Sequence, residues 1–178
     1  MKFIKDLLFF DLQATGPDPD KDNVIQLSAI LLDKDNLLEK SYFNSFVRVS
    51  YLDSLILEHA KILHTDYETM KKSPKIYDVA KAFHDKFGNN LLLATHTLTN
   101  VLFLKNAFKK AVLRFEYDMH IVDLWTLGYI YTLNYGLRKM PTFNTLVDYF
   151  KLKRARPYDA MEKVKLEAEI FRRIIKEV

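Results

Sequence analysis

The feature that most constrains the fold is a short apolar run near the N-terminus that ends abruptly in a charged residue. Residues 7–10 are LLFF, Asp11 follows them, and a Thr-Gly-Pro turn comes at residues 15–17. A run of four apolar residues bounded by turn signals indicates a buried strand in the centre of a sheet. Central strands of this kind are typical of α/β proteins, in which helices cover both faces of the sheet.

Further elements are expected along the whole chain. Strands are predicted at 24–32, 42–49, 91–94 and 119–122, and helices at 52–63, 67–72, 76–87, 100–112, 124–133, 142–150 and 158–176. The last helix rests on an apolar stripe at steps of three and four: Met161, Val164, Ala168, Phe171 and Ile175. Three strands followed by alternating helices and strands predict a mixed five-stranded sheet, antiparallel first and then parallel. Helices should flank it in a single α/β domain over residues 1–178.

Composition excludes several classes of protein. Hydrophobic residues make up 49% of the chain and charged residues 28%, which excludes a disordered tail, a collagen-like fibre and a membrane-embedded bundle. The chain has no cysteine, so disulfides and thiolate metal sites are excluded. No apolar run approaches the roughly 18 residues of a membrane helix, and residues 1–10 do not resemble a signal peptide. We therefore expect a cytoplasmic protein with no membrane partner.

The net charge of +4 is small but unevenly distributed. Residues 151–178 hold nine Lys or Arg against five Asp or Glu, so the rest of the chain is balanced. A solvated helix face and a phosphate-binding edge explain this excess about equally well.

Polar residues gather where the expected strands end, which is where open α/β sheets carry their functional sites. The first strand is followed by DLQATG at residues 11–16. The fourth strand is followed by Thr95 and His96, and its helix opens with Thr99 and Asn100. The last helix is preceded by RARPYDA at residues 154–160.

In this order and spacing, the three segments resemble the motifs of the DnaQ-like (DEDDh-type) 3′–5′ exonucleases of the ribonuclease H-like superfamily. The first motif of that family is Asp-x-Glu-x-Thr-Gly, and its second has an aspartate at the position of Asn100. The third is a histidine, four residues and Asp-Ala, matched here by Arg154 and then Asp159-Ala160. The resemblance covers about residues 6–178 and implies a ribonuclease H-like fold.

In active members of the family, four carboxylates hold two Mg²⁺ ions and a histidine acts as the general base. The resemblance therefore assigns the catalytic positions to Asp11, Gln13, Asn100, Arg154 and Asp159. Three of these five lack the family's side chain, and arginine cannot act as a base because it stays protonated. Asp11 and Asp159 remain as implied metal ligands, for one Mg²⁺ or Mn²⁺ ion at most or for none.

The resemblance implies a degenerate exonuclease-fold protein that binds the 3′ end of single-stranded nucleic acid with little or no hydrolysis. Contacts to the strand are expected from Thr15, Gly16, His96, Arg154 and Arg156. Two other functions stay open: a weak metal-dependent 3′–5′ exonuclease, and a protein-interaction scaffold that presents Trp125, Tyr129, Tyr131 and Tyr135. His96 is also compatible with a structural role, and Asp159 with that of an acid favoured at a helix N-terminus.

Overall fold

The computed structural model describes residues 2–49, 65, 67–136 and 140–177 and contains a mixed five-stranded sheet. Its strands are β1 (Leu7–Ala14), β2 (Val24–Leu32), β3 (Glu39–Phe46), β4 (Leu92–Thr95) and β5 (Val122–Asp123). They lie in the order β3-β2-β1-β4-β5. β1 pairs antiparallel with β2, and β2 with β3, whereas β1–β4 and β4–β5 are parallel. The predicted sheet is therefore confirmed, with β1 at its centre.

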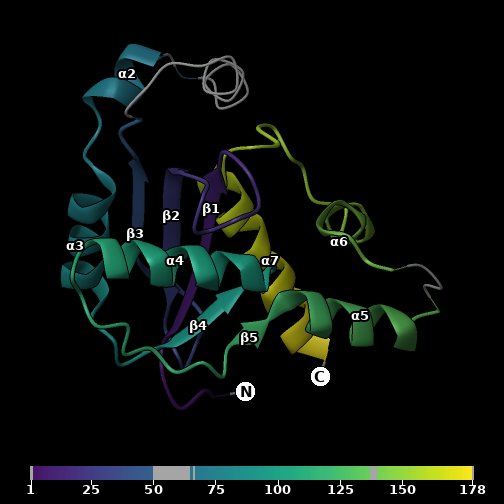
Figure 1. Ribbon diagram of the computed structural model, residues 1–178. Helices are drawn as coiled ribbons and strands as arrows, with labels where there is room; N and C mark the ends of the chain where they lie inside the picture. The colour runs from purple at the N-terminus through teal and green to yellow at the C-terminus, as the bar shows by residue number, and fades with distance from the viewer. Residues whose placement is uncertain (1, 50–64, 66, 137–139, 178) are drawn as a thin grey trace.

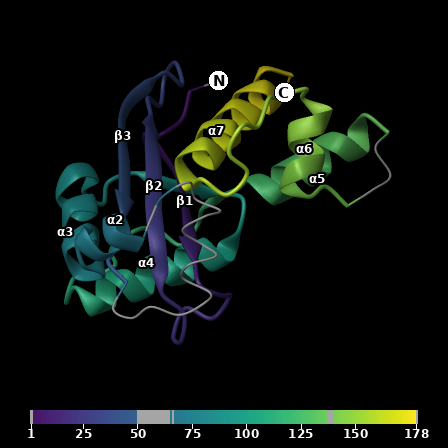
Figure 2. The same ribbon diagram turned by 90° about the horizontal axis from the view of Figure 1, so that it is seen from above.

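Helices cover both faces of the sheet (Figures 1 and 2). They are α2 (Tyr67–Lys72), α3 (Ile76–Phe87), α4 (Leu98–Lys110), α5 (Leu124–Asn134), α6 (Phe143–Tyr149) and α7 (Ala160–Glu177). Figure 2 shows α3 and α4 on one face and α7 on the other, with α5 and α6 beside α7. No helix in the described ranges is long and apolar enough to cross a bilayer. The helix expected at 52–63 lies outside the described residues.

The side chains of β1 alternate between two cores. Leu7 and Phe9 belong to the cluster that contains the apolar residues of α7, whereas Leu8 and Phe10 belong to the cluster under α3 and α4. Because successive side chains of a strand point to opposite faces, Asp11 shares the face of Leu7 and Phe9. Asp11 therefore faces α7. Because β1 continues to Ala14, beyond the expected end of the strand at residue 10, Asp11 lies within the strand.

Two kinds of contact hold α7 on this face of the sheet: an apolar stripe along the helix and a hydrogen bond at its first turn. The expected stripe is buried from Met161 to Phe171, and the Phe171 ring lies 5.1 Å from that of Phe9. At the first turn, Gln26 Oε1 of β2 accepts a hydrogen bond from the backbone N–H of Ala160 (3.1 Å). Gln26 is fully buried, and its Nε2 donates to Asn44 Oδ1 of β3 (3.0 Å). This amide sets where α7 begins relative to the end of β1.

Several boundaries differ from the prediction. β3 spans 39–46 rather than 42–49, and β5 is only two residues long at 122–123 rather than four at 119–122. For β3, the imperfect alternation of polar and apolar residues gives no clear end. Its pairing with β2 sets the boundary instead, from Leu32 opposite Glu39 to Gln26 opposite Phe46.

The aromatic residues of α5 form the two pairs that their spacing indicates. The Trp125 and Tyr129 rings stack at 5.4 Å, and those of Tyr131 and Tyr135 lie 4.7 Å apart. Tyr131 is buried, and its hydroxyl donates to Glu177 Oε2 of α7 (2.6 Å). One pair thus joins α5 to the core, which leaves less of the aromatic patch available for a partner.

Candidate nucleic-acid site at the end of the central strand

Asp11 is the centre of the site and is completely buried. Its Oδ1 accepts a hydrogen bond from Asn100 Nδ2 (2.7 Å), and the same amide nitrogen donates to Thr95 Oγ1 (2.9 Å). Asn100 lies in the first turn of α4, directly after β4, so the parallel β1–β4 pair brings it to Asp11. Here the amide acts as a donor to the buried carboxylate, a role that a deprotonated aspartate at position 100 does not perform.

The second partner of Asp11 is Lys163, one of the basic residues of the C-terminal charge excess. The sequence motifs did not predict a role for this lysine in the site. Lys163 Nζ forms a direct ion pair with Asp11 Oδ1, and it lies 3.8 Å from Glu167 Oε1. Its side chain is only 17% exposed, so it belongs neither to a solvated face nor to an open phosphate-binding edge. One signal in the sequence was available: residues 159, 163 and 167 are four apart and share one face of a helix.

Glu167 is the third member of this buried group and was also missed. It is fully buried, and neither carboxylate oxygen has a hydrogen-bond partner within the described residues. Burial raises the pKa of Glu167 well above its usual value, the nearby Lys163 ammonium opposes that rise, and the Asp11 carboxylate adds to it. Burial therefore disfavours the charged form of Glu167, which lies beside the ion pair of Lys163 and Asp11.

Phe143, at the start of α6, packs against this group and connects it to two other predicted site residues. Its ring lies 5.7 Å from Lys163 Nζ, 5.2 Å from Arg154 Cζ and 5.5 Å from the ring of His96. These distances allow cation–π attraction from both basic side chains. The sequence offered no signal for Phe143, because nothing marks this aromatic as part of a site.

The imidazole of His96 should be neutral at physiological pH. Burial and, to a smaller extent, the Lys163 ammonium lower the pKa of His96 to about 4. We therefore expect its ring resonances in an NMR titration to shift near pH 4 rather than near 6.5, the usual value for histidine. A midpoint for His96 near 6.5 would show that its ring lies in water and not against Phe143.

The residues before α7 are held by capping interactions. Asp159 Oδ1 accepts a hydrogen bond from the backbone N–H of Glu162 (2.9 Å), so Asp159 caps the helix, as the alternative interpretation of this residue anticipated. Its Oδ2 lies 3.4 Å from Arg156 Nη1. Arg154 Nη1 donates to Asn144 Oδ1. The Arg156 side chain is 56% exposed and is the more accessible of the two arginines.

The loop after β1 is locked by an aspartate. Thr15 Oγ1 donates to Asp22 Oδ1 (3.1 Å) and accepts from the backbone N–H of Asn23 (3.0 Å). A Cβ on Gly16 would lie 2.5 Å from Asp22 Oδ2, so any larger residue would force this carboxylate to move away from its partners in the loop. Gln13 is half-buried on the same face of β1 as Asp11.

The structure therefore brings Asp11, Asn100 and Lys163 into contact, while Thr15 and Asp159 are occupied by other partners. The donor set does not fit two Mg²⁺ ions, which need several charged oxygen ligands. Asp11 is neutralised by Lys163, Asp159 caps a helix, and Gln13 and Asn100 are uncharged. In the described parts of the chain, no three acidic or histidine side chains gather into a possible metal site.

Comparisons with known proteins assign the chain to a family. The sequence profile of the Exonuclease family (RNase_T) matches residues 8–171. The chain belongs to this exonuclease family, and its fold is the DnaQ-like, ribonuclease H-like fold that the motifs indicated.

Two curated relatives are bacterial polymerases. The chain is 25% identical over 174 residues to the PolC-type DNA polymerase III of Caldanaerobacter subterraneus subsp. tengcongensis, and 24% identical over 169 residues to that of Bacillus subtilis. These alignments cover 97% and 94% of this chain but only 12% and 11% of the polymerases. The chain thus spans a small part of the length of these relatives.

The similar solved structures are nucleases, unlike the polymerases of the sequence comparison. Cell-death related nuclease 4 superposes with a TM-score of 0.81 at 16% identity, covering 97% of this chain and 64% of that one. The nuclease domain of 3′hExo, a DEDDh family member bound to rAMP, gives 0.76 at 14% identity, covering 99% and 95%. At these identities, the likeness establishes the fold alone.

Proposed function

We propose that this chain binds the 3′ end of single-stranded nucleic acid with little or no hydrolysis. The observation that carries the proposal is the buried ion pair between Lys163 and Asp11. Asp11 is the fully buried acid among the motif positions, and the Lys163 ammonium group occupies it where a metal ion would otherwise bind. At the other motif positions, the amides of Gln13 and Asn100 stand where the family motif has carboxylates, and Arg154 adds a positive charge.

The proposed contacts follow from which side chains are accessible. Arg156, more than half exposed beside Asp159, donates to a backbone phosphate, for which the guanidinium fork is well suited. Arg154 adds positive potential from its position on Phe143. Gly16 lines the terminal nucleotide through its backbone, and Thr15 holds the loop in place for it, because the hydroxyl and the backbone N–H of Thr15 are both bonded within the loop. His96, neutral against Phe143, contributes shape rather than charge.

The relatives support the same class of ligand. Among the similar structures are Escherichia coli exonuclease I with an oligonucleotide and with single-stranded DNA, and a 3′-exonuclease that recognises the 3′ end of a histone mRNA stem-loop. A strand end is therefore a ligand that this fold accommodates in other proteins. The preference for DNA or RNA is an outcome of the binding measurement.

The first test is equilibrium binding of a labelled single strand. We expect binding that is unchanged when EDTA replaces Mg²⁺ and that weakens as salt rises, with a slope of about −0.7 per phosphate contacted. A circular strand of the same length should bind about tenfold more weakly if the end is recognised, and Arg156→Ala should weaken binding of the linear strand by about tenfold. Both DNA and RNA strands are measured.

Lys176→Ala is the matched control for Arg156→Ala, because it removes one exposed charge from the opposite end of α7. It should leave the affinity unchanged. No binding of linear strands at high micromolar concentration, or equal binding of linear and circular strands, would contradict recognition of a 3′ end.

One observation favours a second candidate, a weak exonuclease that uses a single metal ion. Asp11 Oδ2 is buried and has no hydrogen-bond partner among the described residues, so one carboxylate oxygen remains for an ion. Degradation of a labelled strand by the wild-type chain in Mn²⁺, abolished by Asp11→Asn, would favour this candidate over binding alone.

A further inference from the structure

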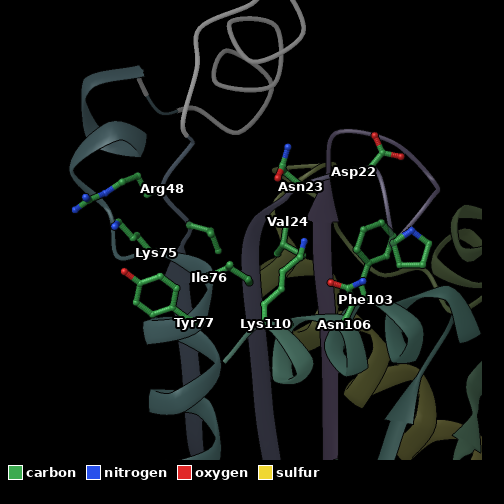
Figure 3. A pocket seen from close by; sticks show the side chains of 13 residues that line it. Asp22, Asn23, Val24, Arg48, Lys75, Ile76, Tyr77, Phe103, Asn106 and Lys110 are labelled. Atoms are coloured by element: carbon green, nitrogen blue, oxygen red, sulfur yellow. The ribbon is translucent and has the colours of Figure 1, made fainter. Parts of the chain in front are cut away.

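Two adjoining hollows lie on the α4 side of the sheet, away from the face that carries Asp11. The first has a volume of about 200 Å³ and is lined by the start of α3, the segment after β3 and one side of α4. Figure 3 shows Arg48, Lys75 and Tyr77 on one side of it, with Asn106 and Lys110 reaching in from α4. The second, of about 760 Å³, lies along the outer side of α4. Pro19 and Asn106 line both, so the two form one surface, here called the α4 groove.

The α4 groove is strongly basic. The first hollow has three basic side chains and the second has three more: Arg48, Lys75, Lys110, Lys105, Lys109 and Arg114. All six are exposed, and within the described residues none makes an ion pair with an acid.

Two acids line the groove, and both are already engaged as hydrogen-bond acceptors. Asp22 accepts from the Thr15 hydroxyl and from the backbone N–H of Asp18, and Asp20 accepts from Asn106 Nδ2 (3.0 Å). Both carboxylates keep their charge, so the six basic and two acidic side chains leave a net charge of +4 in the groove, and like charges at this density repel one another unless an anion lies between them.

Other features of the groove also suit a nucleic-acid strand. The first turn of α3 lies in the first hollow, and no side chain caps it, so its N–H groups and helix dipole favour an anion there. In the second hollow, Leu102 is 50% exposed and Val112 is 93% exposed. Basic groups beside exposed apolar side chains offer one surface for phosphates and another for bases or sugars.

We propose that the α4 groove binds the sugar-phosphate backbone of single-stranded nucleic acid. It is separate from the Asp11 site but joined to it by two elements: α4, whose Asn100 is bonded to Asp11, and the loop after β1, where Thr15 is bonded to Asp22 and Asn23. The inference goes beyond the proposed recognition of a 3′ end, because a groove that holds the backbone needs no strand end. A strand long enough to reach both would be held at its end and along its length.

The experiment measures binding of a circular single strand, which has no end, by variants with two charges removed. We expect Lys75→Ala with Lys110→Ala, and separately Lys105→Ala with Lys109→Ala, to weaken binding by about tenfold. Each pair should also make the salt dependence shallower, by about 0.7 for every phosphate that the variant no longer neutralises. The control pair, Lys34→Ala with Lys81→Ala, removes the same charge from exposed positions outside both hollows and should have little effect.

A tetranucleotide, which offers a 3′ end but few phosphates for the groove, separates this inference from the proposed function. If the tetranucleotide binds and circular strands do not, the groove proposal fails while recognition of the 3′ end stands. If circular strands bind and respond to the groove variants while the tetranucleotide does not bind, recognition of the 3′ end fails and the groove proposal stands. If both groove pairs match the control pair on circular strands, the groove is not a nucleic-acid site.

Discussion

Restoring the family's side chains at three positions should leave the chain without nuclease activity until Lys163 is also removed. The triple variant carries Gln13→Glu, Asn100→Asp and Arg154→His, and the quadruple variant adds Lys163→Ala. We expect the quadruple variant to degrade a single strand in Mn²⁺ at least about 100-fold faster than the triple variant. A 100-fold change in rate corresponds to about 2.7 kcal/mol of activation free energy.

The reason is the charge that Lys163 holds on Asp11. Two unit charges 4 Å apart repel by about 4 kcal/mol at an effective dielectric constant of 20, and a divalent ion beside the ammonium group roughly doubles that cost. The restored carboxylates attract metal, but Asp11 stays occupied. Three substitutions restore the motifs in the sequence. Because Lys163 is buried against Asp11, we expect nuclease activity to require its removal as a fourth change.

The measurement is the rate of shortening of a 5′-labelled strand, together with the shift in melting temperature that Mn²⁺ produces in each variant. Adding Asp11→Asn to the quadruple variant should abolish both signals, which excludes a contaminating nuclease. If the triple variant is as active as the quadruple variant, Lys163 does not block the site.

Removing Lys163 alone should strongly destabilise the protein. Lys163→Met leaves Asp11 buried beside Glu167 without a counter-charge, and loss of one partner of a buried ion pair costs about 3–5 kcal/mol. For a chain of this size, the melting temperature should fall by about 10 °C. An exposed pair would contribute less than about 1 kcal/mol, so the size of the effect tests the burial directly.

A double-mutant cycle, measured by urea unfolding, separates the free energy of the Asp11–Lys163 interaction from the effects of each substitution on other contacts. Asp11→Asn with Lys163→Met should recover most of the stability that Lys163→Met removes, because no ionised group is then left without its partner. Lys165→Met is the control, since Lys165 lies on the exposed side of the same helix and should change the free energy of unfolding by less than about 0.5 kcal/mol. Equal losses in Lys163→Met and Lys165→Met would contradict a buried ion pair.

The helices and strands whose apolar residues recur at regular spacing were predictable from the sequence. The ends of β2, α2 and α3 were predicted to the residue, because turn residues or prolines bound their apolar patterns. The start of α7 was placed two residues early because Asp159, which caps the helix, resembles a helical residue in sequence. The proximity of Asp11 and Asn100 also followed from the motifs, since β1 and β4 are parallel neighbours and α4 follows β4 directly.

The chemistry at those positions was not predictable, because it depends on which face of α7 is buried. The apolar stripe from Met161 to Phe171 fixes the buried side, but Lys163 lies at its margin, where a lysine normally reaches water. Only the approach of β1 turns this side chain inward to Asp11. Phe143, which packs against it, comes from a seven-residue helix whose position depends on tertiary contacts alone.

The contact between Asp11 and Lys163 joins residues 152 positions apart, and this has a consequence for the order of folding. The face of β1 that carries Asp11 is closed by α7, so its charge and its apolar residues stay in water until nearly the whole sequence has been brought together. Contacts of such long sequence separation form slowly. We expect the docking of α7 to be a late step of refolding, so a chain that stops before it would expose one side of its central strand to other molecules.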